Sequence, residues 1–529
     1  MNFDWNNPYP GTRRPVYASN MVAASQPLAA QAGLCILARG GNAVDAAIAA
    51  AATQALTEPT ANGLGSDCCA IVWDGSRLHG LNASGAAPAA WNLDYFRRKH
   101  QGRIPARGWD SVTVPGCVAG WAALHEKLGR MSFADVLEPA IEYAERGFAV
   151  SAAVQRKWAA QADELQPQPG YAEHFLPRGR PPQVGEHFVL QGAAATLKRI
   201  AASGGRDFYE GETAHKLVAH AQAHDAVLTL ADLRDYAPQW TCPVGQTYRG
   251  HTLHQLAPGG QGIAALLALG MLQHFDVAAR PVDHPDTQHL LIEAMKLAQA
   301  DAAARRPGMT PEDLLQAGHL AERARLIDPA HARRGAGGNA PHADAICLSA
   351  VDRNGMMVSL AQSSHMGFGS GVVVPGTGVS LQNGGHGFSA DAGHPDAVAG
   401  GKRPAHAALP AFLMRDGAPV MSFGVVGGDM QPQGQVQALV RMLDYGQQPQ
   451  AACDAPRWRW RHGQTLDVES GLAPSVAQGL LARGHALLAA QDPGQDFGSG
   501  QFIWRLGDPA VDGYVGASDG RRDGLAAGF

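Results

Sequence analysis

The sequence predicts an α+β protein in which helices surround central strands. Two observations predict this class. Helical patterns dominate the chain up to about residue 305, and strand patterns dominate from residue 345 onward. Early in that second part, Asn354-Gly355 separates two apolar runs, 344–352 and 357–362, which is a strong hairpin signal. Because amphipathic helices must bury one face, we expect them to cover the strands in layers.

The individual elements follow from periodicity and from turn residues. Asn42, with Asp45 three residues later, is close to a capping box and starts a helix made mostly of alanine. A second hairpin is predicted at 69–82. Residues 163–190 are rich in proline and glycine and are predicted to form a surface excursion, and 333–341 a flexible loop. Helices are predicted over 27–38, 43–56, 121–128, 133–146, 191–202, 210–222, 259–275, 284–305, 434–444 and 474–483.

Composition and charge exclude several classes of partner. The net charge is -5 over 529 residues and no basic cluster occurs, so nucleic acid is not an expected partner. Apolar stretches such as 43–52 and 263–272 are too short and too rich in alanine to cross a membrane. The 7 cysteines are scattered without metal spacing, which favours a reducing compartment. Because the first residues have neither a basic start nor an apolar run, we expect a cytoplasmic protein.

Seven short motifs follow one another along nearly the whole chain. They lie at residues 20–27, 39–47, 114–121, 248–250, 289–294, 427–434 and 517–524. In number and order they resemble the gamma-glutamyltranspeptidase family of N-terminal-nucleophile hydrolases. The resemblance implies a four-layer αββα sandwich built as one interleaved domain. It also implies a proenzyme that cuts itself into a large-subunit region, 1–344, and a small-subunit region, 345–529, which then form a heterodimer. Whether that heterodimer dimerises again stays open.

Ala345 stands where this family keeps its nucleophile. Relatives have Asp-Thr before an apolar strand, and the threonine hydroxyl attacks an amide carbonyl with its own α-amine as the base. Here the sequence is Asp344-Ala345, and a methyl group cannot attack a carbonyl. Three explanations stay open: an engineered substitution that traps the precursor, a natural loss that leaves a non-catalytic protein of the same fold, or a displaced nucleophile. Cys347 and Ser349 are the candidates for the last, since alternation puts them on the same strand face as residue 345. We favour the interpretation that both are small buried strand residues.

The resemblance also assigns roles around Ala345. Gly427-Gly428 resembles the family's oxyanion hole, in which backbone N–H groups stabilise the charge of the tetrahedral intermediate. Ser363 aligns with a hydroxyl residue that hydrogen-bonds the nucleophile. The predicted substrate-binding residues are His365, Asn383, His406 and Asp429. No cofactor and no metal are expected. A metal site formed by these histidines, Asp429 and His386 is the alternative, but its spacing matches no known metal signature.

Specificity residues depart from those of true transpeptidases. Such relatives keep an arginine before an Ala-Pro pair and an aspartate before a Phe-Ser pair. Here the arginine position falls in Ser84–Pro88, which has no cation, and the aspartate position is Gly387. The paired serines of true transpeptidases correspond to His406-Ala407 in this sequence.

The remaining pattern, including 58–67 and 402–406, is similar to the hydrolytic branch that contains oxamate amidohydrolase of bacterial purine breakdown. Members of that branch often have an arginine near Ala86, and its absence leaves no predicted partner for a substrate carboxylate. We expect hydrolysis of a small amide as the function. The alternatives are a non-catalytic binding protein and a true gamma-glutamyl transferase or hydrolase.

Overall fold

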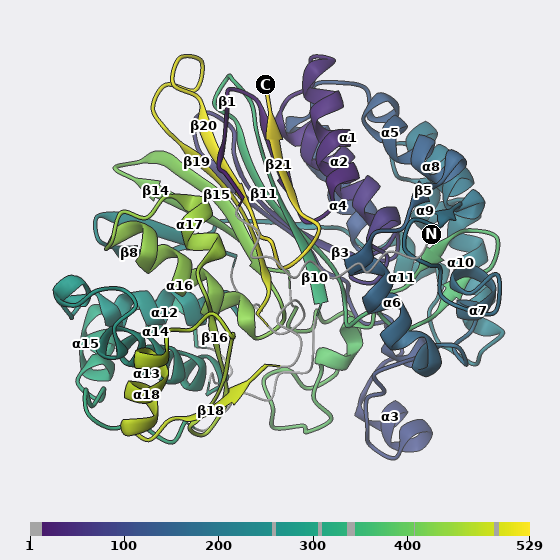
Figure 1. The fold of residues 1–529 in the computed structure, drawn as a ribbon. Coiled ribbons are helices and arrows are strands. Elements are labelled where there is room, and N and C mark those ends of the chain that lie inside the picture. Colours follow the sequence, from purple (N-terminus) through teal and green to yellow (C-terminus); the bar gives the residue numbers. More distant parts are fainter. Residues whose placement is uncertain (1–12, 257–260, 305–308, 336–343, 407, 491–496) are drawn as a thin grey trace.

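Two seven-stranded sheets form the centre of the computed structural model, which describes residues 13–256, 261–304, 309–335, 344–406, 408–490 and 497–529 (Figure 1). In each of the two sheets, every pair of neighbouring strands is antiparallel. The first sheet has the strand order β21 (Leu525–Gly528), β2 (Met21–Ala24), β10 (Asp344–Val351), β11 (Met357–His365), β3 (Asp67–Trp73), β4 (Leu78–Ala83) and β7 (Gln239–Thr241). The second sheet has the order β1 (Val16–Ala18), β20 (Tyr514–Ser518), β19 (Ser499–Arg505), β15 (Ala418–Val426), β14 (Pro410–Arg415), β9 (His251–Gln255) and β8 (Val244–Tyr248).

Both sheets combine strands from the two parts of the chain on either side of residue 344. In the first sheet, β10 and β11 from the later part lie between β2 and β3 from the earlier part. In the second sheet, β14 and β15 from the later part pair with each other, and β14 also pairs with β9 from the earlier part. The strand β10, which contains Ala345, therefore lies inside a sheet, with a neighbouring strand on each side.

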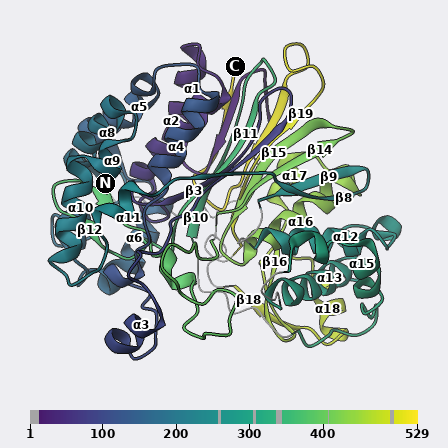
Figure 2. The same ribbon diagram turned by 180° about the vertical axis from the view of Figure 1, so that it is seen from behind.

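Helices cover the outer face of each sheet, so the architecture is the predicted αββα sandwich (Figures 1 and 2). The helices on the first sheet are α1 (Pro27–Ala38), α2 (Ala43–Thr57) and α4 (Cys117–Leu128), with α5 (Phe133–Arg146) and α8 (Gln191–Ser203) outside them. Those on the second sheet are α12 (Gly262–Leu272), α16 (Met430–Leu443) and α17 (Pro449–Asp454), with α13 (Pro285–Ala303) and α18 (Pro474–Ala482) outside them.

Alternation along the strands divides the core into layers. In β3, Cys68, Ala70 and Val72 belong to the core beneath the helices of the first sheet. Cys69 and Ile71 point to the opposite face and belong to the core between the two sheets. Successive side chains of a strand point to opposite faces, so a strand buried on both sides is apolar throughout.

The predicted capping box at the start of α2 is confirmed. The Asn42 side chain accepts hydrogen bonds from the backbone N–H groups of Val44 and Asp45, and the Asp45 carboxylate accepts one from the Asn42 N–H. Every residue of α2 is buried, which its small alanine side chains permit because they allow close approach to β10 and β11.

The surface excursion predicted for 163–190 is wrong in part. The segment contains the end of α6 (Ala152–Leu165) and the short helix α7 (Tyr171–Phe175). Tyr171 and Phe175 are buried, and their ring centroids lie 5.2 and 4.8 Å from that of Phe368. Aromatic burial outweighs the proline and glycine composition here.

Two element boundaries also differ from prediction. The helix α16 starts at Met430 rather than 434, because Pro432 lies in its first turn, where its missing N–H would have no intrahelical partner. The helix predicted at 210–222 is divided at Gly211 into α9 (Asp207–Glu210) and α10 (Glu212–Gln222), since the Asp207 carboxylate accepts from the Glu212 N–H. Much of the predicted helical start at 259 and of the 333–341 loop lies outside the described residues.

The remaining elements are short or peripheral. They are α3 (Leu93–His100), α11 (Leu230–Arg234), α14 (Pro311–Leu314), α15 (Ala317–Ala324), the small sheet of β16 (Trp458–His462), β17 (Thr465–Val468) and β18 (Ala486–Ala489), the pair β12 (Val373–Val374) and β13 (Val379–Ser380), the pair β5 (Phe148–Ala149) and β6 (His187–Phe188), and three 3₁₀ turns at Trp109–Ser111, Val277–Ala279 and Gly384–Gly387. Within the described ranges, no helix has the length and apolar character needed to cross a membrane.

Candidate active site

The β10–β11 hairpin places residue 345 at the start of a central strand. Asp344 pairs with His365 and Ile346 with Gln362, and the register shifts between these two pairs. Ala345 therefore lies at an irregularity of the ladder rather than in a regular pair. Its side chain is fully buried and packs with Cys347 of the same strand and with Val426 of the opposite sheet.

Cys347 and Ser349 share this inter-sheet face, as alternation predicts. The Cys347 thiol lies 3.8 Å from the Ser499 carbonyl oxygen, and the Ser349 hydroxyl donates to the Ser422 carbonyl oxygen at 3.1 Å. Burial raises the pKa of the Cys347 thiol to about 12, so the nucleophilic thiolate form is suppressed at neutral pH. These contacts favour the interpretation that both residues are structural.

Ser363 is the polar neighbour of the Asp344–Ala345 peptide. Its hydroxyl donates to the Asp344 carbonyl oxygen at 2.6 Å and accepts from the His365 N–H at 2.8 Å. The hydroxyl is therefore oriented by two backbone groups and polarises the carbonyl that precedes residue 345.

A cluster of four charges, three of them buried and Asp344 partly exposed, surrounds the same peptide, and we call it the 344 charge cluster: Lys157, Asp344, Glu58 and Arg522. The Lys157 ammonium lies 2.8 Å from Asp344 Oδ2, and the Arg522 guanidinium donates to Asp344 Oδ1. The Arg522 guanidinium also donates to Glu58 Oε1 at 2.9 Å and to the Ala345 carbonyl oxygen at 2.8 Å. Two cations and two carboxylates thus enclose the start of β10.

The electrostatics of the cluster keep Asp344 ionised. Burial by itself would raise the pKa of its carboxyl, but the Arg522 and Lys157 cations outweigh burial and hold it at about 2. Burial raises the pKa of Glu58, and the Arg522 cation opposes that effect. The Glu58 carboxylate also accepts from the Ser25 hydroxyl at 2.8 Å and from the Gln54 amide at 2.9 Å.

Sequence reasoning did not predict the 344 charge cluster. Glu58 and Arg522 lie in motifs of the family resemblance, 58–67 and 517–524, but no role was assigned to either residue. Lys157 lies on α6, which carries no distinctive motif.

Gly427 and Gly428 connect β15 to α16, directly after Val426. Both have positive φ angles, 122° and 61°, and a Cβ atom on Gly427 would come within 2.7 Å of the Gly498 Cα atom. No described residue accepts a hydrogen bond from either of the two backbone N–H groups. The loop therefore offers two donors without an acceptor in the described ranges, next to the residue that contacts Ala345.

The four predicted substrate-binding residues have different environments. Asn383 is buried, and its amide donates to the Ala106 carbonyl oxygen at 2.7 Å and accepts from the Met366 N–H at 3.0 Å, which favours a structural role. Asp429 is buried and forms an ion pair with Arg459 at 2.7 Å, so its charge is already compensated.

The two predicted histidines are neutral. His365 has a positive φ of 76°, and its Nε2 atom is buried without a hydrogen-bond partner among the described residues. Burial, together with His386 and His406, lowers its pKa to about 4. Burial likewise lowers the pKa of His406 to about 4, and its Nε2 atom lies 3.7 Å from the Cys69 thiol. Neutral rings suit hydrogen bonding better than binding of an anion.

The alternative metal site is not assembled. Among described residues, the one group whose ligand atoms converge is His289, Glu293 and His485, away from the predicted set. The Lys296 ammonium lies 2.8 Å from Glu293 Oε1, and His289 Nδ1 lies 2.8 Å from His485 Nε2. Internal hydrogen bonds thus account for this group.

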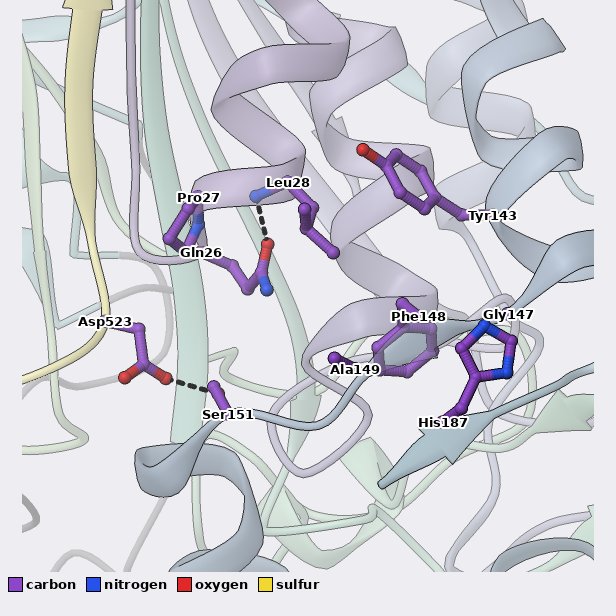
Figure 3. A pocket seen from close by; sticks show the side chains of 10 residues that line it. All are labelled: Gln26, Pro27, Leu28, Tyr143, Gly147, Phe148, Ala149, Ser151, His187 and Asp523. Carbon is purple, nitrogen blue, oxygen red and sulfur yellow. Dashed lines mark hydrogen bonds between the residues drawn. The ribbon is translucent and has the colours of Figure 1, made fainter. Parts of the chain in front are cut away.

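A pocket of about 500 Å³ opens between the start of α1 and the strands β5 and β6, and none of the four residues of the 344 charge cluster lines it (Figure 3). Asp523, which follows Arg522, lies on its wall and accepts from the Ser151 hydroxyl at 2.6 Å. Gln26, which follows Ser25, lies on the same wall, and its side chain caps α1. Mainly apolar groups line the rest, and sequence reasoning did not predict this pocket.

The fold and this site define an N-terminal-nucleophile hydrolase: an αββα sandwich with the nucleophile position at the start of a central strand. The gamma-glutamyltranspeptidase family model matches residues 29–529. The chain therefore belongs to the gamma-glutamyltranspeptidase family, which confirms the resemblance seen in the sequence.

Comparison with individual proteins agrees with this assignment. The chain is 36% identical to a glutathione hydrolase-like YwrD proenzyme of Bacillus subtilis (strain 168), over 96% of this chain and 98% of that protein. It is 34% identical to an oxamate amidohydrolase proenzyme of Klebsiella pneumoniae subsp. pneumoniae, over 97% of this chain and 99% of that protein. The crystal structure of a cephalosporin acylase from Bacillus halodurans superimposes with a TM-score of 0.94 at 43% identity, covering 100% of this chain and 99% of that one. The three names differ in substrate, so family membership fixes the reaction class and leaves the substrate open.

Proposed function

We propose that this chain is the uncut precursor of a small-amide hydrolase, held in that form because residue 345 is alanine. One observation carries the proposal. The Asp344–Ala345 peptide lies at the start of β10 with its carbonyl bound by Ser363. Val426 contacts residue 345 and precedes two N–H donors that have no acceptor among the described residues. This arrangement contains the parts needed for self-cleavage except an attacking hydroxyl.

A threonine at residue 345 would complete the reaction. Its Oγ atom would attack the Asp344 carbonyl carbon, the C–N bond would break, and an ester would form. Water would then hydrolyse the ester, which leaves a carboxyl group on Asp344 and a free α-amine on residue 345. In the mature protein that amine would take the hydroxyl proton while Oγ attacks the substrate amide.

The Gly427 and Gly428 N–H groups would stabilise the negative charge that develops on the substrate carbonyl oxygen, and the loss of one such donor typically costs about 3 kcal/mol. The amide nitrogen would leave as ammonia or an amine, and water would release the acid. We assign Ser363 to orientation of the residue 345 hydroxyl.

We propose a small amide without an amino-acid head group as the substrate class, and oxamate is one member of that class. A gamma-glutamyl head group carries an ammonium and a carboxylate. In this chain, the segments that correspond to their binding sites in transpeptidases have no cation at Ser84–Pro88 and no acid at Gly387. The similarity to an oxamate amidohydrolase proenzyme over 97% of the chain supports the same reaction class.

The decisive experiment restores the hydroxyl. Ala345→Thr should yield fragments of 344 and 185 residues on denaturing electrophoresis, with the shorter fragment starting at residue 345. Ala345→Val is the matched control, because valine has the shape of threonine without its hydroxyl, and this variant should stay whole. The cleaved protein should release ammonia from oxamate. If Ala345→Thr also stays whole after days at neutral pH, the chain is a non-catalytic protein of this fold.

A further inference from the structure

The Asp344 carboxylate is held by two cations and one backbone N–H group. Lys157 Nζ approaches Oδ2 at 2.8 Å, the Arg522 guanidinium donates to Oδ1, and the Ala345 N–H donates to Oδ1 at 2.9 Å. The Lys157 and Arg522 side chains are only 11% and 5% exposed, so little water competes for this carboxylate. Charge-assisted hydrogen bonds of this kind are among the strong ones in proteins.

The two carboxylates of the 344 charge cluster differ in what cleavage would do to them. Glu58 follows α2 and is held by Ser25, Gln54 and Arg522, so it belongs to the permanent fold. Asp344 would instead become the last residue of the large-subunit region, no longer bonded to Ala345. When its side chain leaves, Lys157 loses its only hydrogen-bonded partner among the described residues. Arg522 keeps Glu58 but loses one of its two carboxylates, and its buried Nε atom has no hydrogen-bond partner in the part of the uncut chain that the structure describes.

Departure of Asp344 would leave the cluster with one excess positive charge. Two cations and two carboxylates are balanced before cleavage, whereas two cations and one carboxylate remain once Asp344 has left. A buried cation without a partner is costly, so the vacated site favours binding of a single negative charge.

We propose that Lys157 and Arg522 bind the carboxylate of the substrate, and that Asp344 fills this site in the uncut chain as an internal substrate mimic. This inference rests on the proposed function and names its substrate class: an amide whose carbonyl group is joined by a short chain to a carboxylate. It also supplies the cation that is missing from the segment around Ala86.

The chain length of the substrate follows from the covalent structure of Asp344. Two carbon atoms, Cα and Cβ, separate its carbonyl group from its side-chain carboxylate. The carbonyl is the group that residue 345 would attack, and the carboxylate is the group that Lys157 and Arg522 hold. Succinamate has the same two-carbon spacing, and oxamate has none. We therefore expect activity to rise along the series oxamate, malonamate, succinamate.

A binding experiment on the uncut chain tests the site without any need for catalysis. Asp344→Ala should open it, and millimolar succinamate should then raise the melting temperature of this variant more than that of the parent, at matched ionic strength. Butanamide, the neutral analogue, should have no such effect. Adding Lys157→Met to Asp344→Ala should weaken succinamate binding about tenfold or more, because a charge-assisted hydrogen bond is lost. Lys216→Met, on the surface of α10, is the matched control and should leave binding unchanged.

The catalytic experiment uses the Ala345→Thr chain. Its kcat/KM for succinamate should exceed that for butanamide, and Lys157→Met should reduce that ratio. Equal stabilisation of Asp344→Ala by succinamate and butanamide, or full binding in the Lys157→Met double variant, would overturn the proposal even if Ala345→Thr hydrolyses amides. If Ala345→Thr is inert, the binding experiment alone decides. Asp344→Ser replaces Asp344→Ala should the alanine variant fail to fold.

Discussion

Replacing Asp344 with asparagine should destabilise the folded protein by about 2 kcal/mol at neutral pH. The substitution keeps the shape of the side chain and removes its charge, so it isolates the interaction with Arg522 and Lys157. The pKa of the carboxyl falls from an ordinary value of 3.8 to about 2 in the folded chain. At about 1.4 kcal/mol for each pKa unit, that difference corresponds to about 2 kcal/mol of stability in the ionised state.

The pH dependence gives this prediction its sign. A carboxyl whose pKa is lowered by folding contributes stability above the unfolded value of 3.8, and that contribution disappears as the pH falls towards about 2. The stability difference between the parent and Asp344→Asn should therefore be largest at neutral pH and should close on acidification through this window. Other acid effects are common to both proteins and cancel in the difference.

Urea denaturation followed by tryptophan fluorescence at a series of pH values measures this difference. Asp416→Asn is the matched surface control, because Asp416 is 89% exposed and should contribute almost nothing. A stability loss for Asp344→Asn no larger than that of Asp416→Asn would refute the reasoning. So would a difference that grows as the solution is acidified.

Two further predictions follow from buried geometry. Gly427→Ala should lose on the order of 1–3 kcal/mol of stability, because alanine resists the φ of 122° and its Cβ would meet backbone 2.7 Å away. Gly446→Ala is the control, since its φ is also positive but no atom lies within 4 Å of the added Cβ; equal losses in thermal denaturation would contradict the steric argument. A thiol reagent should label the exposed Cys35 and Cys242 in the native protein and leave Cys347 unmodified, which mass spectrometry of peptides checks. Rapid native labelling of Cys347 would reopen the case for a displaced nucleophile.

Local sequence signals predicted much of the fold. The helix at 27–38 and the hairpin around Asn354-Gly355 depend on caps, turns and periodicity within a few residues, and both are present as predicted. The order of the two sheets could not be derived in this way, because β2 pairs with β10 across more than three hundred residues. The family resemblance supplied the four-layer arrangement where local patterns could not.

Some residues of the candidate site could be predicted from local motifs, and others could not. The position of Ala345 and the loop at Gly427-Gly428 belong to short motifs, so the sequence located them. The partners of Asp344 were missed because an ion pair has no periodicity and leaves no local mark. Arg522 and Glu58 lie 464 residues apart, and only the closed fold brings them together.

Self-cleavage and substrate binding would both use the start of β10, where successive side chains point in opposite directions. Ala345 directs its side chain between the sheets, where it meets Val426 just before the Gly427-Gly428 donors. The preceding residue, Asp344, directs its carboxylate to Lys157 of α6 and to Arg522. An acyl group attacked from residue 345 would thus have its carbonyl oxygen near the glycine loop and its far end near the two cations. The two cations would serve first for the Asp344 carboxylate of the precursor and then for a small acidic amide, so selection for self-cleavage and selection for substrate would act on the same residues.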